Sequence, residues 1–129
     1  MPTRRLILAA LPLIPGRALA HLPSGSRGPN GGQVQDIGSY HAELVLRGND
    51  ILVFVFDHND RPVPVAGATA QAVLLANGRQ ATVPLTPKEG NLLQGTGDLA
   101  EARGIRAVVT LTLPGQRTTQ ARFTPLDPA

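Results

Sequence analysis

The sequence contains no cysteine and no tryptophan, and it has only one tyrosine and three phenylalanines among its 129 residues. Without cysteine there are no disulfide bonds and no thiolate metal sites, so any metal ion must be held by nitrogen and oxygen ligands. The few aromatic side chains offer no platform on which nucleic-acid bases could stack. Stability must therefore come from apolar packing, helped by 12 prolines that restrict the unfolded chain.

Serine is scarce as well, since only Ser24, Ser26 and Ser39 occur, all in a stretch rich in glycine and proline. A hydrolase triad needs a nucleophile that is held within hydrogen-bond reach of its base, which such a stretch does not favour. The sequence also lacks a glycine-rich phosphate loop and a nucleophile elbow. A domain of this size rarely has the cleft that paired carboxylates need for glycoside hydrolysis. We therefore expect that the protein is not an enzyme.

Residues 1–20 show the order of segments that is typical of a signal peptide. Arg4 and Arg5 form a basic start, residues 6–14 form an apolar run, and Ala18-Leu19-Ala20 is a small-residue cleavage site. An uncleaved membrane anchor is the alternative, but the apolar run is well short of the roughly 20 residues that a bilayer span needs. The arginine pair also resembles a twin-arginine signal, so the secretory and twin-arginine routes both stay open. We predict a periplasmic protein that is not embedded in a membrane after cleavage.

The formal net charge of +3 does not describe the mature chain. Arg4, Arg5 and Arg17 precede the cleavage site and account for the whole excess of basic over acidic residues. No cluster of Lys and Arg remains that could neutralise several phosphates, and there is no basic amphipathic helix. Nucleic acid and membrane surfaces are therefore not expected as partners.

From residue 39 onward the pattern is that of one all-β domain. Residues 21–38, rich in glycine and proline, predict a flexible leader into it. Residues 40–47 and 50–57 have the composition of two strands, and Gly48-Asn49 suits a two-residue turn between them. Further strands are expected at residues 69–76, 79–86, 92–99, 106–113 and 117–124. About seven short strands separated by turn signals predict an antiparallel immunoglobulin-like β-sandwich over residues 39–129.

The three histidines are the best candidates for chemistry. A two-residue turn would place Arg47 opposite Asp50, and hence His41 opposite Phe56 and Glu43 opposite Phe54. His58 would then lie diagonal to His41 on the same outward face, so that His41, Glu43 and His58 could converge on one metal ion. The alternatives are that His41 is a surface residue paired with Glu43, and that His58 only belongs to a turn closed by Asp and Asn side chains.

Cleavage after Ala20 would make His21 the first residue of the mature chain, and its amine and imidazole together form a chelate. The predicted outward face also holds Leu52, Phe54 and Phe56, which are too apolar to remain fully exposed. If the leader folds back over this face, His21 arrives near His41 and His58. Such a nitrogen-rich ligand set favours Cu(II), with Zn(II) second.

Four stretches of the sequence resemble a known pattern. Residues 28–34 (GPNGGQV), 38–45 (GSYHAELV), 55–63 (VFDHNDRPV) and 66–70 (AGATA) are similar to small periplasmic proteins and soluble adaptor domains associated with heavy-metal efflux. That family often has an additional histidine before the glycine pair, where this chain has Asn30. In layout, the terminal histidine on a β-sandwich also resembles periplasmic copper carriers, whose N-terminal histidine chelates Cu(II). The resemblance implies metal handling, with a metal-efflux complex or another envelope protein as a partner.

Two hypotheses follow. The first is a periplasmic metal-binding protein that buffers or transfers a copper-like divalent ion through His21, His41, His58 and Glu43. The second is a metal-free interaction module, in which the apolar face around Phe54 and Phe56, or an exposed sheet edge, docks an envelope partner by adding a strand.

Overall fold

The structure is a computed structural model that describes residues 25–98 and 104–125. These residues form eight strands and no helix, and accordingly none of them belongs to a helix that could span a membrane. The predicted signal peptide and His21 lie outside the described residues. The strands are β1 (Gln33–Ile37), β2 (Tyr40–Arg47), β3 (Asp50–Phe56), β4 (Thr69–Ala76), β5 (Arg79–Pro87), β6 (Leu92–Thr96), β7 (Arg106–Thr112) and β8 (Thr119–Phe123).

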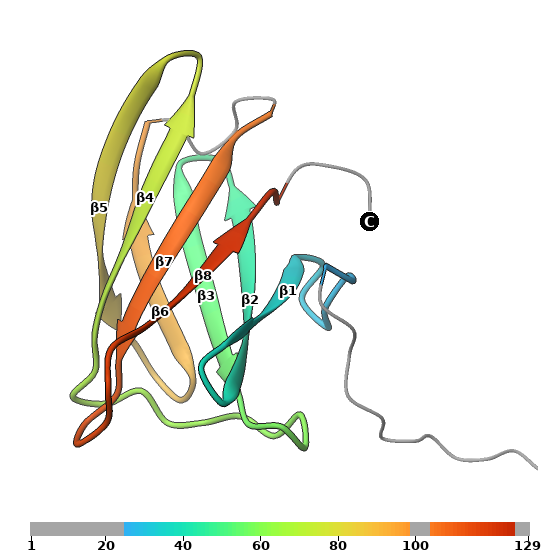
Figure 1. The fold of residues 1–129 in the computed structure, drawn as a ribbon, viewed down its shortest axis with the longest axis vertical. Coiled ribbons are helices and arrows are strands. Elements are labelled where there is room, and N and C mark those ends of the chain that lie inside the picture. Colours follow the sequence, from blue (N-terminus) through green and yellow to red (C-terminus); the bar gives the residue numbers. More distant parts are fainter. Residues whose placement is uncertain (1–24, 99–103, 126–129) are drawn as a thin grey trace, which may run out of the picture.

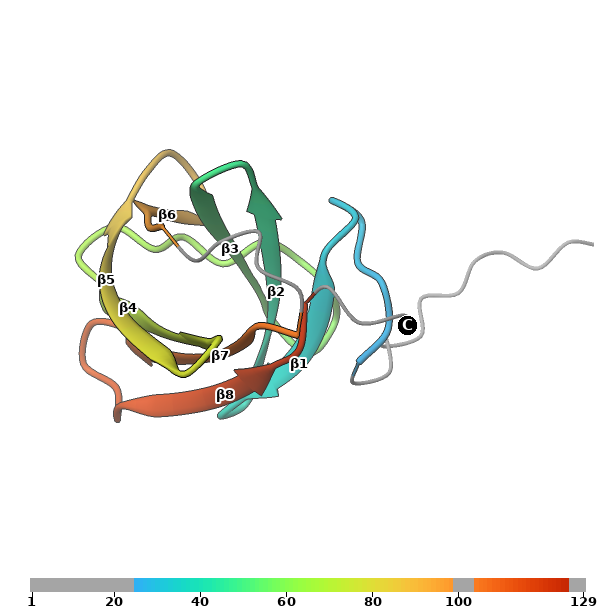
Figure 2. The same cartoon turned by 90° about the horizontal axis from the view of Figure 1, so that it is seen from above.

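The strands are antiparallel and follow one another in the order β1-β2-β3-β6-β5-β4-β7-β8 (Figure 1). Strand β5 belongs to both layers, because residues 79–85 pair with β4 while Thr86 and Pro87 pair with β6. Seen from above, the two layers curve around a common interior (Figure 2). Apart from β1, the orders β2-β3-β6-β5 and β4-β7-β8 are those of the two sheets of an immunoglobulin-like sandwich, and the pairing of β4 with β5 is additional to them. The predicted all-β sandwich is confirmed.

Strand β1 is additional to the predicted set, since it lies in residues 21–38, for which the sequence predicts a flexible leader. It pairs with β2 from Gln33 to Ile37 and buries the side chains of Val34 and Ile37. The turn at Gly38-Ser39 joins the two strands, and Gly38 has a φ of +61°. This strand is difficult to recognise from the sequence, because it is short, follows a stretch rich in glycine and proline, and has only two apolar side chains.

Strands β1 and β8 lie side by side and nearly close the sheet into a barrel (Figures 1 and 2). The side chain of Gln33 joins them: its Oε1 accepts a hydrogen bond from the backbone N–H of Thr124 (2.7 Å), and its Nε2 donates one to the Thr124 hydroxyl (3.2 Å). An amide side chain thus takes the place of a backbone ladder at this seam.

The core lies between the two layers and consists of the inward side chains of the alternating strands. In β4 every second residue is buried or nearly so, from Ala70 to Ala76. The largest fully buried apolar side chains of the core are Phe123, Ile37, Leu44, Ile51, Leu74, Leu93, Ile105 and Leu111.

Candidate functional site

The β2–β3 hairpin has the predicted register. Gly48-Asn49 is a two-residue connection, and Arg47 pairs with Asp50. His41 is therefore opposite Phe56, and Glu43 is opposite Phe54. Since the side-chain period of a strand is two, this register also fixes which residues share a face: Ala42 and Leu44 point into the core, and His41, Glu43 and Val45 point outward.

Glu43 lies on the outward face of β2, as the register predicts, but the chain itself covers this face at Glu43. Its side chain is fully buried, at 0 % exposure, and both carboxylate oxygens accept hydrogen bonds. Oε2 accepts from the backbone N–H groups of Asn30 and Gly32 (2.8 Å each), and Oε1 accepts from the Asn30 side-chain amide (2.9 Å). Three donors therefore hold this carboxylate, so it anchors a loop and is not placed as a metal ligand.

The loop that Glu43 anchors comprises residues 28–32 and will be called the GPNGG loop. It packs so closely that a Cβ on Gly32 would lie 2.2 Å from the carbonyl oxygen of Leu44. A Cβ on Gly28 would lie 2.5 Å from the Glu43 carboxyl carbon. Gly31 has a φ of +83°, which favours glycine. The glycines of this loop are thus required by close approach and by a left-handed turn.

The segment before β1 folds back onto the outer face, as expected for the leader. Residues 25–27 pair with the start of β1 through the Arg27–Gln33 bridge and the backbone hydrogen bond from Val34 to Ser26. Beneath the segment, Val34 and Val45 are buried, and Leu52 beside Val45 is buried too. Phe54 and Phe56 remain half-buried. The segment before β1 therefore covers the outer face of β2 but leaves Phe54 and Phe56 on β3 partly exposed.

His41 contacts a carboxylate from the neighbouring strand. Its Nδ1 lies 2.9 Å from Oδ1 of Asp36, the residue opposite it on β1. The His41 side chain is 12 % exposed, whereas that of Asp36 is 66 % exposed. The alternative pairing with Glu43 is therefore wrong, because the GPNGG loop occupies that carboxylate. Asp36 is not among the residues predicted from the sequence, because strand β1 is not predicted. The two-residue turn at Gly38-Ser39 places Asp36 opposite His41 once β1 is recognised.

His58 is exposed in the turn that follows β3. Asp57 shapes this turn: its Oδ1 accepts hydrogen bonds from the backbone N–H groups of Asn59 (2.8 Å) and Arg61 (3.0 Å). The hydrogen bond from Arg61 is the largest of the effects that lower the pKa of Asp57 below its ordinary value. Desolvation opposes it and is next in size, and the bond from Asn59 and the charges of His58 and Arg61 lower the pKa further. His58 thus belongs to a turn that the Asp57 side chain closes, and the residue is exposed.

No group of three or more His, Asp or Glu side chains within residues 25–98 and 104–125 is arranged to hold a metal ion. Of the predicted set, Glu43 is buried under the GPNGG loop and His41 contacts Asp36. His58 lies in the turn two residues beyond Phe56, the residue opposite His41. His21, the remaining predicted ligand, lies outside the described residues.

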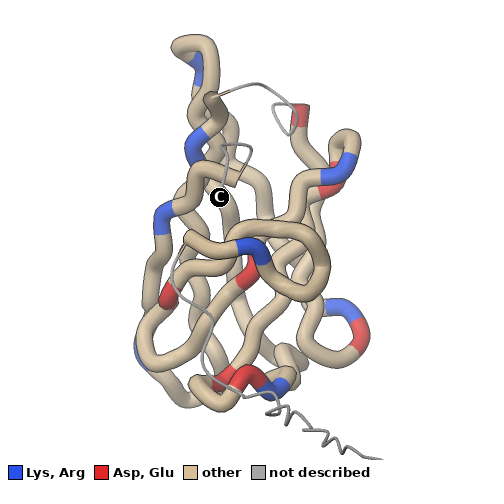
Figure 3. The backbone as a smooth tube through the Cα atoms, turned by 90° about the vertical axis from the view of Figure 1, so that its right-hand side faces the viewer, with Lys and Arg blue, Asp and Glu red and all other residues tan. Residues whose placement is uncertain are grey.

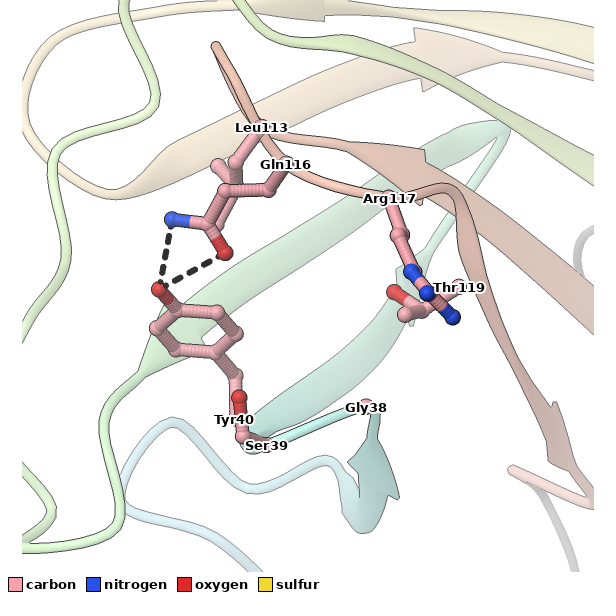
Figure 4. A pocket seen from close by; sticks show the side chains of 7 residues that line it. All are labelled: Gly38, Ser39, Tyr40, Leu113, Gln116, Arg117 and Thr119. Atoms are coloured by element: carbon pink, nitrogen blue, oxygen red, sulfur yellow. Dashed lines mark hydrogen bonds between the residues drawn. The ribbon is translucent and has the colours of Figure 1, made fainter.

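A pocket of about 300 Å³ lies where the β1–β2 and β7–β8 turns meet (Figure 4). The phenol of Tyr40 and the side-chain amide of Gln116 point toward each other across it and exchange hydrogen bonds of 2.9 and 3.1 Å. Arg117 and Thr119 lie on its opposite side, and Gly38 passes so near Thr119 that a Cβ would lie 2.6 Å from its methyl group. Among the predicted ligands that the structure describes, none lines this pocket. The hydrogen bonds between Tyr40 and Gln116 join the two turns there.

Comparison with known proteins gives no assignment: no family model matches the chain, and neither a curated protein nor a solved structure is similar to it.

Proposed function

We propose that this chain is an exported periplasmic protein that binds a copper-like divalent ion and buffers or transfers it. The observation that supports this proposal best is the contact between His41 and Asp36. The charge of a carboxylate 2.9 Å from Nδ1 favours the tautomer that carries its proton on that nitrogen, although the two atoms do not have the geometry of a hydrogen bond. The lone pair then resides on Nε2, which is the arrangement in which metal-binding histidines are usually held.

The proposed ligands are His41, His58 and the terminal His21, without Glu43. Since the described residues assemble no three-ligand group, the proposal depends on His21, whose amine and imidazole would add two nitrogens. Three histidines and an amine form a nitrogen-rich set, which prefers Cu(II) to Zn(II). The exposed Asp36 would act by orienting His41.

The alternative is a metal-free interaction module that docks an envelope partner. The half-buried Phe54 and Phe56 on the outer face of β3 favour it, because large aromatic side chains are enriched at protein interfaces. The two functions differ in their dependence on the histidines. Replacing His41 and His58 with alanine abolishes metal binding in the first case and leaves partner binding intact in the second.

Calorimetric titration of the mature protein with Cu(II) and Zn(II) tests the proposal, with the cleavage site confirmed by intact mass. We expect stoichiometric Cu(II) binding that is weakened about ten-fold or more by one extra alanine before His21 and by His41→Ala. Asp36→Asn should weaken it about ten-fold while leaving the stoichiometry unchanged. Gln71→Ala, on the exposed face of β4, is the control. Absence of binding tighter than about micromolar would reject the metal hypothesis in favour of the interaction module.

A further inference from the structure

The outer face of β4, β7 and β8 combines apolar and cationic side chains. Leu75 on β4 is opposite Arg106 on β7, and Val108 on β7 is opposite Arg122 on β8. Arg106 and Arg122 are therefore diagonal neighbours on one face, which we call the arginine face. Leu75 is 37 % exposed, and it is the one large apolar side chain classed as exposed in the described part of the chain.

The charged residues of the strands on this side of the molecule are all basic. Strands β4, β5, β7 and β8 contain three arginines (Arg79, Arg106 and Arg122) and no acidic residue. In Figure 3, blue segments follow one another down the upper left edge with no red segment between them. Neither Arg106 nor Arg122 has an ion-pair partner within the described ranges. Both arginines are exposed, so nothing in the described part of the chain keeps a carboxylate of another molecule from them.

Between these side chains the surface is hollowed. The hollow has a volume of about 180 Å³, and Leu75, Val108, Phe123 and the two arginines contribute to its lining. Pockets for cofactors and drug-sized ligands usually have volumes of about 300–1,000 Å³, so this hollow suits a single side chain. Its apolar lining favours an aliphatic group, and the arginines at its rim favour flanking negative charge.

We propose that the arginine face binds an acidic polypeptide segment of a partner protein, in which carboxylates flank an aliphatic side chain. The aliphatic group enters the hollow beside Leu75, and the carboxylates pair with Arg106 and Arg122, whose planar guanidinium groups bind carboxylates through two parallel hydrogen bonds. Two arginines are too few for a nucleic acid, and lipid-binding clusters usually hold about 4–8 basic residues. The proposal is independent of metal binding, because His41 and His58 belong to the β2–β3 side.

The test measures fluorescence anisotropy of a fluorescein-labelled hexapeptide of alternating glutamate and leucine, titrated with the mature protein. The matching glutamine–leucine peptide is the uncharged control. We expect the acidic peptide to bind more tightly, and added salt to weaken its binding. The double variant Arg106→Gln/Arg122→Gln should lose about ten-fold in affinity or more, and Leu75→Ser should lose several-fold.

A matched double variant on the other side of the molecule, Arg47→Gln/Arg61→Gln, removes the same charge and should change the affinity by less than about two-fold. Equal losses in both double variants would show that only net charge matters and would overturn the proposal. So would equal binding of the two peptides. Binding to phosphatidylglycerol vesicles without binding to the peptide would assign the face to a membrane and would also reject the proposal. Urea unfolding midpoints confirm that each variant is folded.

Discussion

Strands β2 and β4 lie in opposite layers, and their outer faces differ. In β4 the outward residues Thr69, Gln71 and Leu75 are exposed, and burial alternates along the strand. In β2 four consecutive residues, 42–45, are buried, so that both faces are covered. The difference arises because the chain before β1 forms a further layer on β2, whereas the described residues place nothing comparable on β4.

A carboxylate that is covered by its own chain loses its hydration and needs hydrogen bonds from the protein instead. Glu43 would be an ordinary outward residue on a strand such as β4. On β2 it replaces lost hydration with three hydrogen bonds from the GPNGG loop, two of them from backbone N–H groups that would otherwise need water. Glu43 on the outer face of β2 thus holds the GPNGG loop in place.

The largest effect is expected for Glu43→Ala, which should lower the free energy of unfolding by about 3 kcal/mol, because the buried N–H of Gly32 loses its acceptor. Urea unfolding at pH 7 measures this loss. Glu89→Ala, at an exposed position, is the control and should have little effect. A loss below about 1 kcal/mol for Glu43→Ala would mean that the loop does not depend on the carboxylate.

Substitutions of glycine separate close approach from backbone strain. Gly32→Ala forces a Cβ against the Leu44 carbonyl and should cost about 2–3 kcal/mol. Gly31→Ala in the same loop and Gly78→Ala in the β4–β5 turn meet open space but have positive φ, so each should cost only about 1 kcal/mol. Unfolding midpoints of the three variants measure the order. Equal losses at Gly31 and Gly32 would contradict the tight packing of the loop.

A smaller, pH-dependent effect is expected at Asp57. Its pKa is lowered in the folded state, chiefly by the hydrogen bond from the Arg61 N–H, so the unfolded chain binds the proton more readily. The stability that this carboxylate contributes is therefore present at neutral pH and is lost as the pH falls below about 4. Urea midpoints of the wild type and Asp57→Asn from pH 7 to pH 2.5 should converge in acid. If the two midpoints differ by the same amount at every pH in this range, the charge of Asp57 does not contribute to stability.

The sequence predicts the strands and the β2–β3 register well, because Gly48-Asn49 determines the turn and the alternation of apolar residues determines the faces. It does not predict the surroundings of Glu43 or the partner of His41. Both depend on β1 and the GPNGG loop, whose glycines indicate flexibility when read alone. Only the contact with β2 makes those glycines necessary, and that contact joins residues 11–13 positions apart, beyond the reach of a local pattern.

The smallest effect is expected on the uncovered side. Leu75→Ser should change the free energy of unfolding by less than about 0.5 kcal/mol, because Leu75 is exposed and no layer packs on it within the described chain. Its neighbour Leu74 is fully buried, so Leu74→Ala should cost about 3 kcal/mol and serves as the positive control. Urea unfolding of the two variants measures the contrast. A loss at Leu75 close to that at Leu74 would mean that another part of the chain covers β4 as the GPNGG loop covers β2, and the arginine face would then be closed to a partner.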